Sequence, residues 1–241
     1  MVPGCSGANC TGGHDVYFDN FVLAANAPFS PNILANGNLN TPGSPAGFTI
    51  TNTVNDNWEI STASFANDTG VAGHAGMWFR SFQGGNVNIS QTVAGTAGQY
   101  TFTVQAKAQQ GYSGLDPLSM TQSFIELDFL NGSTVIGSQM LDLRNAGLDS
   151  TANAGQGAWK LLTLMGTAPA MTTNVRVSAY ATGMVNSGID PQGLFFDDFS
   201  LMKTGPGSGA AVPEPGSLIL ILTGAIGAAV CARRNRPAQA V

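Results

Sequence analysis

The sequence predicts an all-β protein, a β-sandwich of the jelly-roll type, and three observations support this fold class. Glycine contributes 31 of the 241 residues, which indicates many turns and little helix. Stretches in which apolar and polar residues alternate recur along the chain, and a period of two is typical of half-buried strands. About 200 residues precede the C-terminal segment, enough for one sandwich with a sizeable core.

The predicted strands follow one another through the middle of the chain. In residues 99–108, aromatic and aliphatic side chains alternate with polar ones. Residues 125–129 show the same period and lead to Asn131-Gly132, a dipeptide typical of a tight hairpin turn. The remaining predicted strands cover 134–136, 175–181 and, more loosely, 87–93. Many short strands separated by turns are typical of a sandwich or jelly roll.

The charge balance excludes one class of partner. Charged residues make up only 10% of the chain, and without Glu214 and the three arginines of the tail the net charge is −7. A negative protein repels the phosphate backbone, so nucleic acid is not an expected partner. Neutral and cationic partners are compatible with this charge.

The cysteines and histidines show no metal-binding pattern. Cys231 lies in an apolar run, so only Cys5 and Cys10 can pair with each other, and the sequence leaves both the disulfide and the two free thiols open. The two histidines, His14 and His74, lie far apart, and no spacing of cysteine or histidine is typical of zinc.

A repeated segment suggests how the chain is divided. Phe18–Leu23 matches Phe196–Leu201 position by position. We therefore interpret residues 1–27 as the closing strand of a preceding jelly-roll copy, which fits the absence of a readable secretion signal. A chance match and an extra strand of a single domain are the alternatives. Residues 28–203 are the predicted sandwich, and 204–211 a flexible linker of glycine, serine and proline.

The C-terminal segment, residues 212–241, combines three kinds of sequence in a fixed order. It begins with Val212, Pro213, Glu214 and Pro215, and the two prolines favour an extended backbone that is open to a partner. Residues 217–232 form an uncharged run near the lower limit of about 17 residues for a spanning helix. The tail, 233–241, starts with the basic residues Arg233, Arg234 and Arg236. Positive charge places this end in the cytoplasm and the preceding residues outside.

This order resembles the PEP-CTERM sorting signal of Gram-negative bacteria, in which a Val-Pro-Glu-Pro motif, a transmembrane helix and an arginine-rich tail end an exported protein. The resemblance implies recognition by an exosortase, a membrane protease that cuts near the motif. It implies anchoring in the inner membrane before processing, and a final place at the cell surface or in the extracellular matrix. An ordinary tail anchor behind a proline-containing linker is the alternative.

A second resemblance covers residues 32–203 and depends on the order of several weak landmarks. These are Asn36-Gly37, Asn57-Trp58, His74-Ala75-Gly76, Trp159 and the closing Phe196–Phe199. Their order is similar to that of jelly-roll carbohydrate-binding modules of the family 4 and 9 type. Such modules often carry glutamate after the opening Asn-Gly, where this chain has Asn40.

The second resemblance implies a structural calcium ion between the opening and closing strands. Asn40, Asp197 and Asp198 are the predicted ligands, since calcium prefers oxygen donors. Asp197 falls on the same face as Phe195 and Phe199, so a buried carboxylate there needs a cation or hydrogen bonds. Because Asn40 carries no charge, the alternative is that Asp197 accepts backbone hydrogen bonds or caps a turn.

Glycan binding requires exposed aromatic side chains on which sugar rings can stack. The predicted platforms are Tyr112, in a loop-like glycine-rich setting, and Trp78. Tyr180 is a further aromatic candidate, whereas Trp58 and Trp159 stand at landmark positions that usually serve packing.

The sequence offers little to support an enzyme. Glycosidases need two facing carboxylates, and we interpret Glu126 and Asp128 as a solubilising strand surface. No serine stands in a Gly-x-Ser-x-Gly elbow. The sequence therefore predicts a non-catalytic exported protein of the surface or of an exopolysaccharide matrix, with weak glycan binding. The alternative is an accessory carbohydrate-binding module of a larger, truncated glycoside hydrolase.

Overall fold

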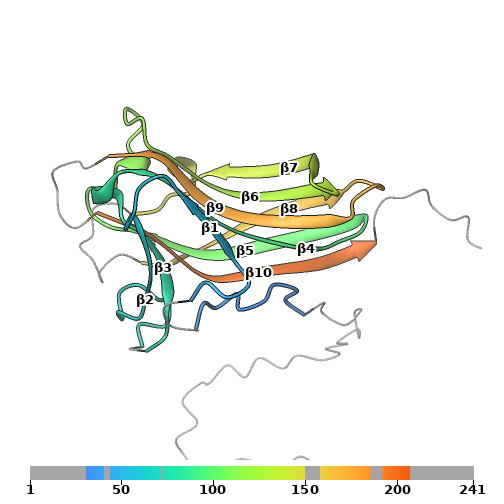
Figure 1. Ribbon diagram of the computed structural model, residues 1–241, viewed down its shortest axis with the longest axis horizontal. Coiled ribbons are helices and arrows are strands. Elements are labelled where there is room, and N and C mark those ends of the chain that lie inside the picture. Colours follow the sequence, from blue (N-terminus) through green and yellow to red (C-terminus); the bar gives the residue numbers. More distant parts are fainter. Residues whose placement is uncertain (1–30, 41–43, 72, 150–157, 186–191, 207–241) are drawn as a thin grey trace, which may run out of the picture.

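A computed structural model describes residues 31–40, 44–71, 73–149, 158–185 and 192–206 (Figure 1). The predicted repeat remnant, the sorting motif, the apolar run and the basic tail all lie outside these described residues. So do the two cysteines of the N-terminal segment.

The described chain folds into two five-stranded antiparallel sheets packed face to face (Figure 1). The first sheet has the order β1-β4-β9-β6-β7, and its strands are β1 Thr49–Asn52, β4 Gly85–Ala94, β9 Asn174–Met184, β6 Gln122–Asn131 and β7 Thr134–Asp142. The second has the order β2-β3-β10-β5-β8, and its strands are β2 Trp58–Ser61, β3 Gly76–Phe79, β10 Leu194–Pro206, β5 Gly98–Ala108 and β8 Lys160–Ala168. Helical structure in the described residues is limited to the short 3₁₀ turns Ser81–Gln83, Ser113–Leu115 and Leu143–Asn145. The predicted all-β sandwich is confirmed.

The strands predicted from alternation are confirmed in place. They fall in β4, β5, β6, β7 and β9, and the turn predicted at Asn131-Gly132 joins β6 to β7. Gly132 adopts a φ of +61°, a backbone conformation that glycine accepts without a steric penalty. The alternating apolar side chains of β9, Val175 to Ala181, are completely buried between the sheets.

Aromatic rings fill the space between the two sheets. Phe102, Phe129, Phe196 and Phe199 are at most 1% exposed. Phe102 of β5 stacks with Phe199 of β10 at a centroid distance of 6.3 Å. Burying one such ring contributes about 1.5–3 kcal/mol to folding. The inner faces of the strands therefore stabilise the sandwich, which leaves their outer faces for other roles.

The closing strand β10 is irregular at one point. Its register against β5 shifts between Asp197 and Ser200, and Asp198 there has a φ of +49°. The opening segment, residues 31–40, forms hydrogen bonds with β10 at this shift and just after it. Phe199 N donates to the Gly37 carbonyl oxygen at 2.8 Å. A Cβ at Gly37 would lie 2.0 Å from the Phe199 carbonyl oxygen, so only glycine permits this approach.

Two further findings concern the C-terminal boundary and the membrane. Strand β10 continues to Pro206, so the first three residues of the predicted linker, 204–206, belong to the strand. Within the described ranges, no helix is long and apolar enough to cross a bilayer.

Candidate functional site

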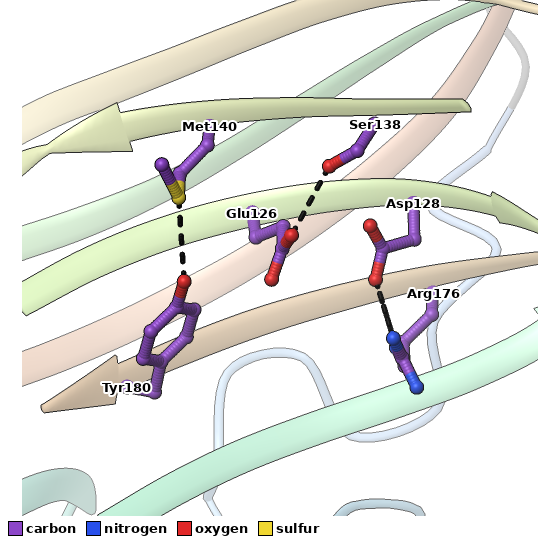
Figure 2. Close-up of polar contacts among 6 residues, drawn as sticks. All are labelled: Glu126, Asp128, Ser138, Met140, Arg176 and Tyr180. Carbon is purple, nitrogen blue, oxygen red and sulfur yellow. Dashed lines mark hydrogen bonds and ion pairs between the residues drawn. The ribbon is translucent and has the colours of Figure 1, made fainter. Parts of the chain in front are cut away.

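The outer face of the first sheet gathers polar and aromatic side chains from four neighbouring strands. Alternation turns every second residue of β4, β9, β6 and β7 outward. We call this surface the Tyr180 face, and its central residues are Asn88, Phe124, Glu126, Asp128, Ser138, Met140, Arg176 and Tyr180. Figure 2 shows six of them projecting from β6, β7 and β9.

Strand register sets the neighbours on the Tyr180 face. Tyr180 stands opposite Asn88 of β4 on one side and Phe124 of β6 on the other. Farther along the strands, Asp128 stands opposite Arg176 of β9 and Ser138 of β7. The side chains are therefore positioned by three pairs of hydrogen-bonded strands rather than by loops.

A charge pair fixes one end of the Tyr180 face. Asp128 is only 1% exposed, although it points away from the hydrophobic core. Arg176 donates to its Oδ2 from Nε at 3.0 Å and from Nη2 at 2.6 Å (Figure 2). A buried carboxylate without a cation is costly, so this guanidinium is what permits the burial of Asp128.

Glu126 lies on the same strand, two residues from Asp128, and has a different environment. Ser138 Oγ donates to Glu126 Oε1 at 3.1 Å (Figure 2). Partial burial raises the pKa of the Glu126 carboxyl, and the charge of Asp128 raises it further. Among the described residues, no cation forms an ion pair with Glu126. Glu126 is thus a carboxylate with remaining capacity to accept hydrogen bonds.

Tyr180 supplies an aromatic ring in the middle of this surface. Its ring centroid lies 5.2 Å from that of Phe124, with a tilt of 34°. The hydroxyl donates to Met140 Sδ at 3.3 Å (Figure 2). Partial burial raises the pKa of Tyr180, and the negative charge of Glu126 adds to the effect. Opposite Tyr180, Asn88 has a buried Oδ1 atom with no hydrogen-bond partner.

The prediction that Tyr112 is an exposed sugar platform is wrong. Tyr112 is 2% exposed, and its hydroxyl forms a hydrogen bond with Ser123 Oγ inside the sandwich. Burial raises the pKa of this phenol above its usual value. This packing also explains why residue 114 is glycine, because a Cβ at Gly114 would lie 2.5 Å from the Tyr112 ring. A ring enclosed in this way cannot stack on a sugar.

Trp78 belongs to an aromatic cluster on the outer face of the second sheet. Phe195 stacks on it at 5.7 Å, and Phe65 and Phe82 approach at 5.8 and 5.9 Å. The guanidinium of Arg80 lies 4.8 Å from the centre of the Trp78 ring. With this many partners, the ring serves packing in the described structure.

The other tryptophans also pack. Trp58 is partly buried against the core. Trp159 lies 6.4 Å from Phe195, edge to face. Both observations agree with the packing role expected from their landmark positions.

Two of the three predicted calcium ligands, Asp197 and Asn40, already accept hydrogen bonds from the backbone. Asp197, 3% exposed, accepts hydrogen bonds from Asp68 N at 3.1 Å and from Asp198 N at 2.8 Å. Asn40 Oδ1 accepts from Ala75 N at 3.4 Å. Burial nevertheless raises the pKa of Asp197 to about 7. Among the described residues, no three acidic, histidine or cysteine side chains are arranged to hold a metal, so calcium remains a prediction.

Sequence reasoning missed most of the Tyr180 face. It named Tyr180 as an aromatic candidate, treated Glu126 and Asp128 as a solubilising surface, and did not consider Arg176. Alternation did place these side chains outward on their strands. What it could not show is that β6 and β9, about 50 residues apart in the chain, are neighbours in the sheet.

Comparison with known proteins adds the following similarities. Residues 211–235 match the PEP-CTERM protein-sorting motif. No curated protein matches the chain significantly.

Solved structures with a similar fold have diverse descriptions. A family 61 carbohydrate-binding module, TmCBM61, in complex with β-1,4-galactotriose is 17% identical with a TM-score of 0.49, over 73% of this chain and 100% of that one. A family 16 carbohydrate-binding module is 13% identical with a TM-score of 0.41, over 70% and 99%. A cyclase from Fischerella sp. TAU is 13% identical with a TM-score of 0.46, over 73% and 98%. All three TM-scores lie below 0.5, and none of these likenesses bears on what this chain binds.

Proposed function

We propose that this chain is a non-catalytic exported protein that binds neutral glycans through the Tyr180 face and reaches the cell surface or matrix through its C-terminal signal. The PEP-CTERM match at residues 211–235 implies an exported protein that is sorted by an exosortase at the membrane. Within that match, Val212, Pro213, Glu214 and Pro215 are the proposed recognition motif, and Arg233 and Arg234 belong to the proposed basic stop. Arg236, the third arginine of the proposed stop, follows directly after the match.

The strand order supports a jelly roll as the delivered domain. Without the short strands β1 and β2, the sheets have the orders β4-β9-β6-β7 and β3-β10-β5-β8. Eight antiparallel strands divided between two such sheets are the jelly-roll arrangement. Successive strands in this arrangement mostly alternate between the sheets, so each outer face is built from segments far apart in the chain.

The observation that carries the glycan proposal is the position of the Tyr180 ring near two hydrogen-bond acceptors with unused capacity. Asn88 Oδ1 has no hydrogen-bond partner, and Glu126 accepts one hydrogen bond, from Ser138. A sugar ring needs a flat apolar surface for its C–H face and acceptors for its hydroxyls. Tyr180 with Phe124 supplies the first, and Glu126 with the unpartnered Asn88 Oδ1 supplies the second. An unpaired buried acceptor costs free energy until a ligand donates to it.

Charge narrows the class of glycan. The Tyr180 face has two carboxylates and one guanidinium, and the guanidinium is already bound to Asp128. The chain as a whole has a net charge of −5. Polysaccharides rich in uronate or sulfate are repelled by this charge, so neutral glycans are the proposed ligands.

A glycan array with the full chain, kept in solution by a sugar-free detergent, tests this proposal. We expect binding to neutral oligosaccharides and at least tenfold weaker binding for Tyr180→Ala, because the stacking surface is removed. Tyr180→Phe is the matched control: it keeps the ring, loses only the contact with Met140 Sδ, and should bind within about twofold of the wild type. Equal binding by wild type and Tyr180→Ala would refute the assignment.

The non-catalytic part of the proposal needs its own measurement. Incubating the full chain with each bound oligosaccharide and measuring reducing ends should show no increase over buffer. New reducing ends that disappear in Glu126→Gln would instead indicate a glycosidase.

A further inference from the structure

The opposite side of the sandwich contains a cavity that the proposed function does not use. It lies between the opening segment and strands β5, β8 and β10, and its volume is about 480 Å³. Figure 1 shows the opening segment, in blue, alongside β10. Its lining includes Asn36, Asn38, Thr103, Gln105, Leu161 and Asp198. Ligand sites typically have volumes of roughly 300–1,000 Å³, so the opening-segment cavity is large enough for a small ligand.

Hydrogen bonds hold the walls of the cavity in place. Asn32 Nδ2 donates to the Phe199 carbonyl oxygen at 2.9 Å, and Leu201 N donates to Asn32 Oδ1 at 3.0 Å. Together with the bond from Phe199 N to Gly37, they attach the opening segment to β10. The cavity is therefore preformed, which reduces the entropy lost when a ligand binds.

Two residues of the lining adopt unusual backbone conformations. Asn36 has a φ of +50° and Asp198 a φ of +49°, although neither is glycine. Such conformations are unfavourable and persist where the surrounding structure imposes them, often at binding sites. Both residues stand next to the contact between Gly37 and Phe199.

The lining also contains unpaired polar atoms of opposite kinds. Asn36 Nδ2 is a donor and Gln105 Oε1 is an acceptor, and both are buried without a hydrogen-bond partner. Most buried polar atoms in proteins have partners, so two exceptions around one cavity are unusual. A ligand that both donates and accepts hydrogen bonds satisfies both, and hydroxyl groups do so.

The remaining lining disfavours an anionic ligand. None of the ten lining residues, all within the described ranges, is lysine or arginine, so no cation is available for an anionic ligand. Amide and hydroxyl side chains predominate, with Thr103 and Ser200 supplying the hydroxyls. Leu161 is 56% exposed and gives the cavity one apolar side. This combination suits an uncharged ligand with many hydroxyls and one apolar face.

We propose that the opening-segment cavity is a second binding site, for an uncharged, hydroxyl-rich unit such as one sugar ring of a neutral polysaccharide. The site belongs to the second sheet and the Tyr180 face to the first, so the two sites look away from each other. Because of this geometry one domain can hold two glycan chains at once. That last consequence depends on the proposed function, whereas the cavity site does not.

The test is a titration of the full chain, in a sugar-free detergent, followed by NMR through the side-chain amide signals of Asn36 and Gln105. The probes are neutral trisaccharides of glucose, galactose and mannose, with a glucuronate-containing trisaccharide as the anionic comparison. We expect at least one neutral probe to shift both amide signals and the anionic probe to shift neither.

Two variants separate binding from folding. Gln105→Leu removes the unpaired acceptor, so it should weaken binding at least fivefold and leave the melting temperature unchanged or higher. A structural role for Gln105 would lower the melting temperature instead. Thr103→Phe fills the cavity and should weaken binding at least tenfold. Thr101→Phe is the matched control, because Thr101 is the neighbouring outward residue of β5 and lines a different, smaller hollow.

Two outcomes would overturn the cavity site. One is the absence of a shift with every neutral probe, and the other is an equal shift in wild type and Thr103→Phe. Tyr180→Ala keeps this test independent of the proposed function. It should weaken array binding by the Tyr180 face at least tenfold and leave the amide shifts of Asn36 and Gln105 intact.

Discussion

The ammonium group of Lys107 lies 4.8 Å from the centre of the Trp159 ring. Lys107 is 3% exposed, and its Nζ donates a hydrogen bond to the Phe65 carbonyl oxygen. A second ring, that of Phe195, lies 5.3 Å away. A cation is thus enclosed by aromatic rings and one carbonyl, with no carboxylate paired to it among the described residues.

Because of this environment, the free energy of unfolding should depend on pH in the alkaline range. Burial lowers the pKa of Lys107 from 10.5 to about 8. Between about pH 8 and 10.5 the unfolded chain binds the proton and the folded chain does not, so folding becomes more favourable as pH rises. We expect the free energy of unfolding of the wild type, relative to Lys107→Met, to rise across this range, measured by urea denaturation at several pH values. A difference that stays constant with pH would contradict the lowered pKa.

The ion pair on the Tyr180 face should be required for stability. Arg176→Met leaves the buried carboxylate of Asp128 without its cation, and we expect a loss of about 1–3 kcal/mol at pH 7. The double variant Arg176→Met with Asp128→Leu should be more stable than Arg176→Met alone, because it removes the unpaired charge. Additive losses in urea denaturation would contradict the pairing.

Gly37 should tolerate no side chain. A Cβ there would overlap the Phe199 carbonyl oxygen, so Gly37→Ala must displace the opening segment from β10. We expect a loss of about 2 kcal/mol or more, the range of severe steric substitutions. Gly137→Ala is the control, since its Cβ would meet the Phe129 ring at an ordinary contact distance of 3.4 Å. Comparable melting temperatures for the two variants would contradict this account.

Calcium is the ion to test at Asp197. Asp68 and Asp198 lie close to each other, and partial burial together with Asp68 raises the pKa of Asp198 to about 6. Neighbouring carboxylates repel one another when both are charged, and a bound cation would relieve this repulsion. We expect millimolar calcium at pH 8 to raise the melting temperature and a chelator to reverse the change. Asp197→Asn should reduce the response, and an unresponsive wild type would leave Asp197 with its two backbone hydrogen bonds alone.

The sorting signal predicts a defined cleavage. In a host with an exosortase, the mature protein should lose the residues after about Pro215, and mass spectrometry of its C-terminus measures this directly. The same chain expressed without an exosortase should retain its tail. Replacing Glu214 by Ala should prevent cleavage in the host with an exosortase. An intact tail in every host would instead fit an ordinary membrane anchor.

The sequence predicted the fold better than the site, for a physical reason. Alternation is local, so β5, β6 and β9 could be located from their own residues. Contacts between distant segments are not local, and they decide whether a side chain is exposed. Tyr112 shows this: its glycine-rich surroundings suggested an exposed loop, whereas the fold places the ring next to Ser123 in the core. The pairing of Asp128 with Arg176 likewise became visible only through the neighbouring strands.

Strand β10 has a mechanical consequence. It lies between β3 and β5 in the middle of its sheet and ends at Pro206, five residues before the matched sorting motif begins. Five residues span at most about 18 Å, so an attachment at the motif would transmit tension almost directly to this strand. The backbone hydrogen bonds of β10 with β5, from Leu194 to Pro206, and with the opening segment would resist this force. A protein held at this end would thus resist pulling through a central strand that is paired on both sides.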